Sequence, residues 1–97
     1  MAKYISLIKY TQKGIENVKE SPSRLDAFKK LCESMGAKVE ESYLTMGRYD
    51  LIVIVDAPNS EAIAKIALAT ASRGSVSTET LQAFPEKEYK KIIGALP

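Results

Sequence analysis

The chain has 97 residues, enough for one domain with a core of two packed layers of secondary structure. Hydrophobic residues make up 45% of it and charged residues 27%, which excludes a disordered chain of low hydrophobicity. The 14 basic and 12 acidic residues are interspersed and give a net charge of only +2, so no face is expected to bind nucleic-acid phosphates.

Two residue counts restrict the chemistry further. The chain has no histidine, which excludes imidazole as a base, metal ligand or haem ligand, and its one cysteine, Cys32, allows neither an internal disulfide nor a Cys-x-x-Cys site. We therefore expect no metal and no cofactor. No apolar run approaches the length of a membrane span and no signal peptide follows Met1, so a cytoplasmic location is expected.

The first strand is predicted at residues 3–10, where alternation separates two sets of side chains: Ile5 and Leu7 on one face, and Tyr4, Ile8 and Tyr10 on the other. Thr11 is expected to cap a short helix over residues 12–18. Gly14 weakens that helix, which limits it to one or two turns.

The next helix has clearer boundaries. Ser21 is predicted as its N-cap and Pro22 as its first helical residue, and Gly36 is predicted to end it in a left-handed conformation. Between these ends the apolar residues recur at helical spacing and form one stripe: Leu25, Phe28, Leu31, Cys32 and Met35. Cys32 is therefore interpreted as a core residue.

Residues 37–44 predict a more polar strand that suits the edge of a sheet, with Val39, Glu41 and Tyr43 on one face. A short hairpin at residues 45–48 predicts antiparallel pairing with the strand at residues 47–56.

That third strand is apolar at the centre of both faces. Leu51, Val53 and Val55 point to one side, and Ile52 and Ile54 point to the other. Both faces of the sheet must therefore be covered.

The second long helix is predicted to begin with Asn59 or Ser60 as its cap and to run to about Ser72, where Gly74 stops it. Its core stripe is Ala62, Ile63, Ile66, Ala67 and Thr70, and further apolar residues lie off the stripe: Ala64, Leu68 and Ala71. A helix that is apolar nearly all round is usually buried on more than one side, which points to a second subunit.

Residues 75–84 predict the fourth strand, which Pro85 ends. Residues 86–97 form a C-terminal tail, expected either to make an amphipathic turn that docks on a neighbour or to fray.

The order of elements predicts an α+β, ferredoxin-like βαββαβ fold in one domain, with a four-stranded antiparallel sheet and two helices on one face. The other face of the sheet is left bare. We expect a second copy of the chain to cover it, in a dimeric α/β barrel or a larger homo-oligomer. The alternative is a monomer in which the tail covers the sheet.

Residues 47–50 read Gly-Arg-Tyr-Asp. This sequence matches the Gly-x-Tyr-Asp signature for which the GYD domain family is named, and the chain resembles that family. The resemblance continues in residues 11–15, 21–24 and 78–84. It implies a stand-alone ferredoxin-like domain of the dimeric α/β-barrel group and no particular activity.

A looser resemblance over residues 47–84 is to the effector-binding domain of leucine-responsive transcription regulators. Those domains oligomerise through their sheets and bind amino acids at subunit interfaces. The chain lacks their helix-turn-helix, so a similar role is expected to be ligand sensing or assembly without DNA contact.

Eight residues are candidates for binding a small molecule: Tyr10, Arg24, Tyr43, Arg48, Tyr49, Asp50, Thr78 and Glu79. Four tyrosines are expected to be amphipathic interface anchors, the alternative being that they line a shared pocket between sheets: Tyr4, Tyr10, Tyr43 and Tyr49. Asp50 is a candidate base or amine-binding group, but the preferred interpretation is that it accepts turn amides in the hairpin and fixes the register.

Charge placement suggests two further roles. Arg24 lies in the first turn of a helix, where a cation opposes the dipole, so we expect it to pair with Glu16, Glu20 or an anionic ligand. Glu79 shares a face with Leu81 and is either a buried acid at an interface or a solvated edge residue.

Three functions remain open. The first is an oligomeric ligand-binding or assembly domain without catalysis, the second a cofactor-free enzyme such as an isomerase or monooxygenase, and the third a purely structural subunit. An apolar cavity beside Asp50 or Glu79 would favour the enzyme. An RNA-recognition module is excluded because Leu51, Val53 and Val55 occupy the positions that need stacking rings.

Overall fold

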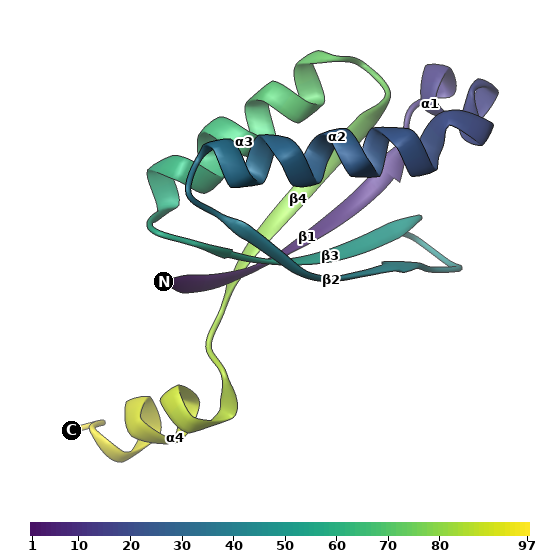
Figure 1. Ribbon diagram of the computed structural model, residues 1–97. Coiled ribbons are helices and arrows are strands. Elements are labelled where there is room, and N and C mark those ends of the chain that lie inside the picture. Colours follow the sequence, from purple (N-terminus) through teal and green to yellow (C-terminus); the bar gives the residue numbers. More distant parts are fainter.

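The computed structural model describes all 97 residues as an α+β fold with one four-stranded antiparallel sheet (Figure 1). The strands are β1 (Ala2–Tyr10), β2 (Lys38–Leu44), β3 (Leu51–Ala57) and β4 (Val76–Ala83). They lie in the order β2-β3-β1-β4, with β2 at one edge as predicted. The predicted ferredoxin-like arrangement is confirmed.

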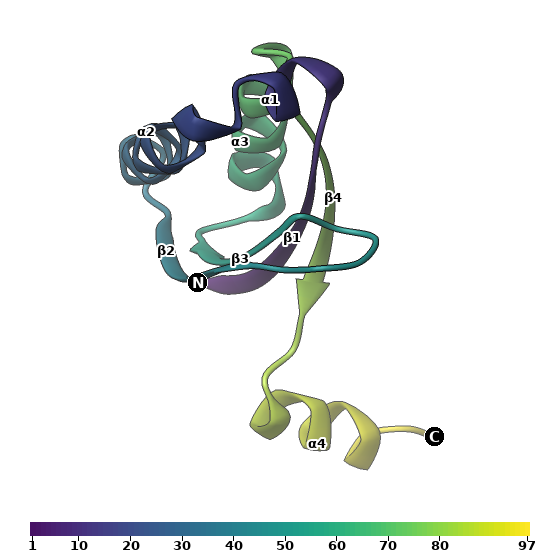
Figure 2. The same ribbon diagram turned by 90° about the vertical axis from the view of Figure 1, so that its right-hand side faces the viewer.

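Two long helices, α2 (Ser21–Ser34) and α3 (Ser60–Ser72), lie on the same face of this sheet (Figures 1 and 2). A short helix α1 (Gln12–Glu16) and a 3-10 turn, η1 (Val18–Glu20), connect β1 to α2. The tail forms a further helix, α4 (Glu86–Gly94), which projects away from the sheet on the side opposite α2 and α3. None of these helices combines the length and the apolar character that crossing a membrane requires.

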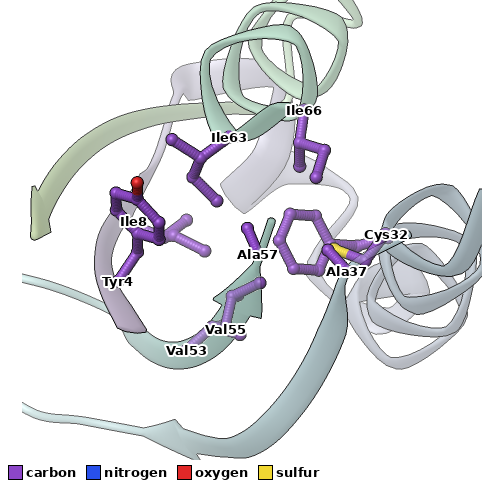
Figure 3. Close-up of a cluster of buried hydrophobic side chains, with 10 residues drawn as sticks. Tyr4, Ile8, Cys32, Ala37, Val53, Val55, Ala57, Ile63 and Ile66 are labelled. Carbon is purple, nitrogen blue, oxygen red and sulfur yellow. The ribbon is translucent and has the colours of Figure 1, made fainter. Parts of the chain in front are cut away.

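The core lies between the sheet and the two long helices (Figure 3). Alternation along the central strands places Tyr4 opposite Val55, and both side chains face the helices. Val53 and Val55 have no exposed surface, and burial of such a side chain contributes about 1.5–3 kcal/mol to folding. The predicted helix stripe is confirmed by the buried Phe28 and Cys32.

The ends of the helices follow from local chemistry, with one exception. The Asn59 side chain caps α3 by accepting from the Ala62 amide at 2.9 Å, and Gly36 and Gly74 follow α2 and α3 at φ +75° and +83°, as predicted. The prediction that Ser21 is an N-cap is wrong. Ser21 is already helical, because η1 runs directly into α2 and the Val18 carbonyl accepts its amide.

A β-bulge in β2 corrects the predicted faces of that strand. Val39 pairs with Val55, but the next paired residue is Glu41, opposite Ile54, so Glu40 is extra. The alternation predicted to place Val39, Glu41 and Tyr43 on one face is therefore wrong. Val39 faces the helices, whereas Glu41 and Tyr43 face the open side of the sheet.

β3 starts at Leu51, later than the predicted strand at residues 47–56. The chain is still turning before that point, because the Thr45 amide donates to the Asp50 carbonyl at 2.8 Å and the Thr45 hydroxyl donates to the Tyr49 carbonyl at 2.7 Å. The hairpin connection is therefore longer than predicted, and Tyr49 and Asp50 belong to it.

α1 packs closely against the start of β4. The Thr11 hydroxyl caps α1 by accepting from the Gly14 amide at 3.2 Å, and the Thr11 amide donates to the Ser75 carbonyl at 3.1 Å. A Cβ built at Gly14 would overlap that same Ser75 carbonyl oxygen. Gly14 thus allows the backbones of α1 and of the residue before β4 to approach closely. The low helix propensity of glycine predicts a short helix here but does not predict this contact.

Candidate functional site

The eight predicted binding residues do not form one site. Tyr10 and Arg24 line a cavity between the helices and the sheet, and Tyr43 lines an adjoining groove at the β2 edge. Arg48, Tyr49, Thr78 and Glu79 line a separate hollow beside Leu7 and Lys9, which belong to the open side of the sheet. Asp50 lines none of the three.

The cavity has a volume of about 270 Å³ and combines an apolar floor with a polar rim. Ile8 and Leu51 from the sheet and Phe28 from α2 form part of the floor. The rim carries the side chains of Tyr10, Ser21, Ser23, Arg24, Glu20, Thr70, Arg73 and Ser75. Sites for small molecules commonly have this composition, with an apolar lining and a few polar groups that orient the ligand.

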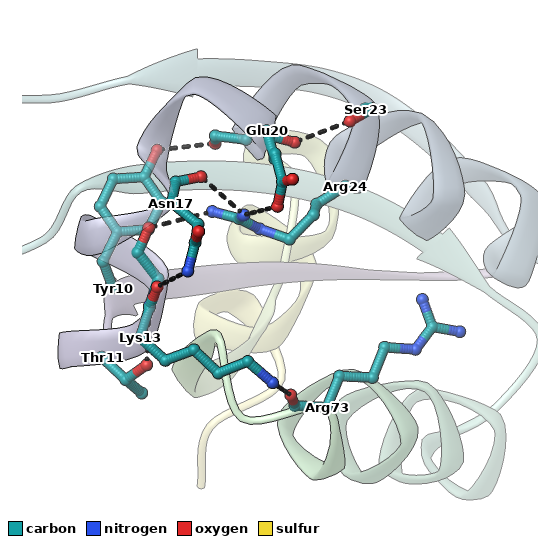
Figure 4. A network of polar contacts seen from close by, with 10 residues as sticks. Tyr10, Thr11, Lys13, Asn17, Glu20, Ser23, Arg24 and Arg73 are labelled. Atoms are coloured by element: carbon teal, nitrogen blue, oxygen red, sulfur yellow. Dashed lines mark hydrogen bonds and ion pairs between the residues drawn. The ribbon is translucent and has the colours of Figure 1, made fainter.

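Arg24 is held at this rim by the segment that precedes its helix (Figure 4). Its guanidinium donates to the Asn17 carbonyl at 3.0 Å and the Gly14 carbonyl at 3.3 Å, and one of its nitrogens lies 3.9 Å from a carboxylate oxygen of Glu20. The predicted pairing with Glu20 is present. These three acceptors offset the unfavourable place of a cation in the first turn of α2.

Asp50 connects two strands instead of facing a cavity. Its carboxylate accepts from the Tyr10 amide at 2.8 Å, and its own amide donates to the Ile8 carbonyl at 2.8 Å. The sequence predicted that the Asp50 carboxylate accepts from amides within the hairpin. It instead accepts from the Tyr10 amide at the end of β1, so Asp50 fixes β1 against the hairpin.

The hollow on the open side is shallow and polar. The Tyr49 hydroxyl donates to the Glu79 carboxylate at 2.9 Å, and the Arg48 guanidinium lies 5.9 Å from the centre of the Tyr49 ring. Glu79 is exposed, which favours the solvated interpretation over a buried acid. Thr78 pairs with the buried Ile8, so its side chain faces the helices and it borders the hollow through its backbone.

Tyr43 is half-exposed on the open side of the sheet. The neighbouring Glu41 carboxylate raises the pKa of the Tyr43 hydroxyl, through hydrogen bonding to the phenol and through its negative charge. The raised pKa extends to higher pH the range in which the phenol can donate a hydrogen bond to Glu41.

Sequence reasoning assigned no role to Arg73, which follows the last residue of α3. Its backbone carbonyl accepts from the Lys13 ammonium at 3.1 Å, while its guanidinium extends along the cavity rim without a hydrogen bond or ion pair (Figure 4). Only the packing of α1 against the end of α3 brings this residue beside the end of β1. No local motif could have shown it.

The open side of the sheet carries apolar side chains that no helix of the chain covers (Figure 2). Ile5 pairs with Ile54 and with Leu81, and Leu7 pairs with Ile52, so these five side chains are neighbours on one face. Charged residues lie at both ends of this apolar centre. Lys3 and Asp56 pair at 3.4 Å at one end, and Lys9 and Glu79 lie at the other.

Comparison with known proteins finds similar sequences along most of the chain. The model of the family described as the GYD domain matches residues 4–93. A protein of Thermus thermophilus named "glutamine synthetase and cystathionine beta-lyase binding protein" is 35% identical over 86 residues, which cover 88% of this chain and 90% of that protein.

Two solved structures share the fold. One, a protein also from Thermus thermophilus, is 26% identical with a TM-score of 0.56 and coverage of 87% of this chain and 94% of that chain. The leucine response regulatory protein of Mycobacterium tuberculosis has a TM-score of 0.64 at 14% identity. The match covers 86% of this chain but only 50% of that regulator, and at this identity it shows the fold alone.

Proposed function

The chain belongs to the GYD domain family, and on that premise we propose that it is a small, non-catalytic binding module that associates with copies of itself through the open side of its sheet. The observation that carries this proposal is the apolar centre of that face, formed by Ile5, Leu7, Ile52, Ile54 and Leu81. An antiparallel sheet exposed to water on one side normally carries polar residues there.

The pattern of the face suits contact with an identical face. Two sheets that pack face to face lie about 10 Å apart and bury the side chains between them. Here a central apolar patch is bordered by residues of both charges, such as Lys9 and Glu79, which matches the polar rim and apolar core of protein interfaces. A twofold dimer brings this patch against its own copy.

α4 offers a second surface for the same neighbour. Its apolar residues Tyr89, Ile92 and Ile93 follow helical spacing and are exposed, as is Leu96 just beyond its end. The helix projects on the same side of the molecule as the open sheet face (Figure 2). A second copy that covers the sheet would therefore lie beside α4 and could bury its apolar stripe.

A protein partner other than a second copy is also part of the proposal. The relative from Thermus thermophilus is named for binding two enzymes, glutamine synthetase and cystathionine beta-lyase. We extend to this chain only the general role of binding another protein. After self-association through the sheet, the outer surface of α3, where Leu68 is 72% exposed, remains free for such a partner.

The residues that line the cavity support a cofactor-free enzyme less well than a binding module. Neither Asp50 nor Glu79 lines it, and the only carboxylate that does is Glu20. That side chain is 71% exposed and faces Arg24, so it is not a desolvated acid suited to proton transfer. Binding is therefore favoured over catalysis.

The proposal is tested by sedimentation equilibrium of the wild-type chain and two matched aspartate variants. Ile54→Asp places a charge at the centre of the open sheet face, and Leu68→Asp places one on the exposed surface of α3. We expect the wild type and Leu68→Asp to be dimeric or larger at micromolar concentration, and Ile54→Asp to be monomeric with unchanged far-ultraviolet circular dichroism.

A monomeric wild type would contradict the proposal. An Ile54→Asp variant that folds and still assembles would contradict it as well, and dissociation by Leu68→Asp alone would move the interface to α3. If Ile54→Asp fails to fold, the milder Ile54→Thr keeps a β-branched residue and is expected to weaken assembly.

A further inference from the structure

We propose that the cavity between α2, α3 and the sheet binds a small organic carboxylate, with its apolar body on the cavity floor and its charged group on the guanidinium of Arg73. The proposal does not rest on self-association, because one chain forms the whole cavity.

The cavity is a cleft of about 270 Å³ that opens to solvent between α2, α3 and the sheet. Its size is in the range of a small organic molecule and exceeds that of a few water molecules. The core residues behind it, Val53 and Ile66, are 0% and 1% exposed, so the opening is not part of a loosely packed core. Ile8, Leu51 and Phe28 on the floor call for an apolar occupant.

Charge at the mouth selects an anion. Arg73 is the cation of the rim whose guanidinium has no partner, whereas that of Arg24 is already bound to two carbonyls and faces Glu20. Lys13, which lies outside the cavity lining, holds the backbone of Arg73 by donating to its carbonyl at 3.1 Å. The Arg73 side chain is thus anchored at its base and free at its charged end (Figure 4).

The shape of the guanidinium and the hydroxyls beside it favour a carboxylate. A guanidinium donates two parallel hydrogen bonds to the two oxygens of a carboxylate. Ser75 lines the same rim, and the Tyr10 and Ser21 hydroxyls, 2.8 Å apart, form a further polar pair at its edge. An inorganic anion would leave the apolar floor empty, so the ligand class is a carboxylic acid with a short aliphatic or aromatic body.

Binding is tested by titrating the isotopically labelled chain with hexanoate and benzoate and following backbone amide shifts by NMR. We expect saturable shifts at residues around the cavity, such as Leu51, Ser75 and Val76. The neutral amides hexanamide and benzamide are expected to bind at least about tenfold more weakly, because they lack the charge that strengthens the hydrogen bonds.

Two variants distinguish the contribution of the Arg73 charge from that of the cavity volume. Arg73→Gln is expected to weaken carboxylate binding by about tenfold or more, whereas the matched control Arg48→Gln, on the far side of the sheet, leaves it unchanged. Ala27→Leu fills the cavity from α2 while keeping the charge, and is expected to abolish binding.

Three results would overturn the inference: no saturable shift with either acid, shifts confined to the open side of the sheet, or equal affinity of the wild type and Arg73→Gln. The monomeric Ile54→Asp variant is expected to bind the acids as the wild type does. Failure of assembly and failure of ligand binding can therefore be told apart.

Discussion

Cys32 shows how burial sets the chemistry of a single side chain. It has no exposed surface, and desolvation, with a smaller contribution from the charge of Glu33, raises the pKa of its thiol from 9.0 to about 11. The thiol is therefore protonated and shielded in the folded chain, consistent with its interpretation from helical spacing as a core residue.

This shift predicts a loss of stability in alkali. The unfolded chain releases the thiol proton near pH 9.0, whereas the folded chain holds it to about pH 11, so the stabilisation is complete below pH 9 and is lost as the pH rises towards 11. Urea unfolding at about pH 8 and about pH 10.5 should show the wild type losing about 2 kcal/mol more than Cys32→Ala. The two proteins differ only at residue 32, so equal losses of stability would contradict the raised pKa of the Cys32 thiol.

Gly14 is predicted to be intolerant of a side chain because its Cβ would overlap the Ser75 carbonyl oxygen. Gly14→Ala should therefore destabilise the fold by about 1–3 kcal/mol, although alanine favours helix over glycine. Gly94→Ala is the matched control, since nothing lies within 4 Å of a Cβ at Gly94. Thermal unfolding measures both, and an unchanged midpoint for Gly14→Ala would contradict the close approach of α1 and β4.

At the level of elements, the sequence predicted what depends on local signals. Helical spacing, the Asn59 cap and the glycines after each long helix located α2 and α3, and alternation identified the faces of β1, β3 and β4. The errors arose where a local irregularity interrupts the regular pattern. The extra Glu40 reverses the faces of β2, and η1 removes the need for a cap at Ser21.

The exposed apolar residues of α4 are predicted to contribute to self-association. Ile92→Asp combined with Ile93→Asp alters side chains that are 45% and 51% exposed, so the fold itself should be unaffected. If α4 docks on a neighbouring copy, the double variant should weaken self-association by about tenfold or more, as measured by sedimentation equilibrium. Lys87→Ser with Lys91→Ser, on the polar side of α4, is the control and should assemble normally. Equal assembly of both variants would show that α4 takes no part.

At the scale of the whole molecule, the order of elements and the handedness of crossovers were sufficient to predict the ferredoxin-like fold. They were not sufficient to assemble the candidate site. Arg24 and Tyr10 meet at one cavity because α1 and η1 fold back between β1 and α2, and Arg73 joins them through the contact of its carbonyl with Lys13. Such long-range juxtapositions depend on packing and leave no periodic signal in the sequence.

Long-range packing also explains why the predicted binding residues lie on two different faces of the sheet. Arg48, Tyr49 and Glu79 follow the hairpin and β4 to the open side, whereas Tyr10 and Arg24 line the cavity between the helices and the sheet. The signature at residues 47–50 identified the family but does not itself form a cavity. In this fold Asp50 of that signature holds β1 to the hairpin through the Tyr10 amide.

The central claim is that two copies of the chain meet through the open faces of their sheets. Isotope-filtered NMR on a mixture of labelled and unlabelled chains tests it most directly, because it detects only contacts between different chains. We expect intermolecular contacts among the methyl groups of Ile5, Leu7, Ile52 and Ile54. Intermolecular contacts that involve Leu68 on α3 but none of these four residues, or no intermolecular contacts at all, would contradict it.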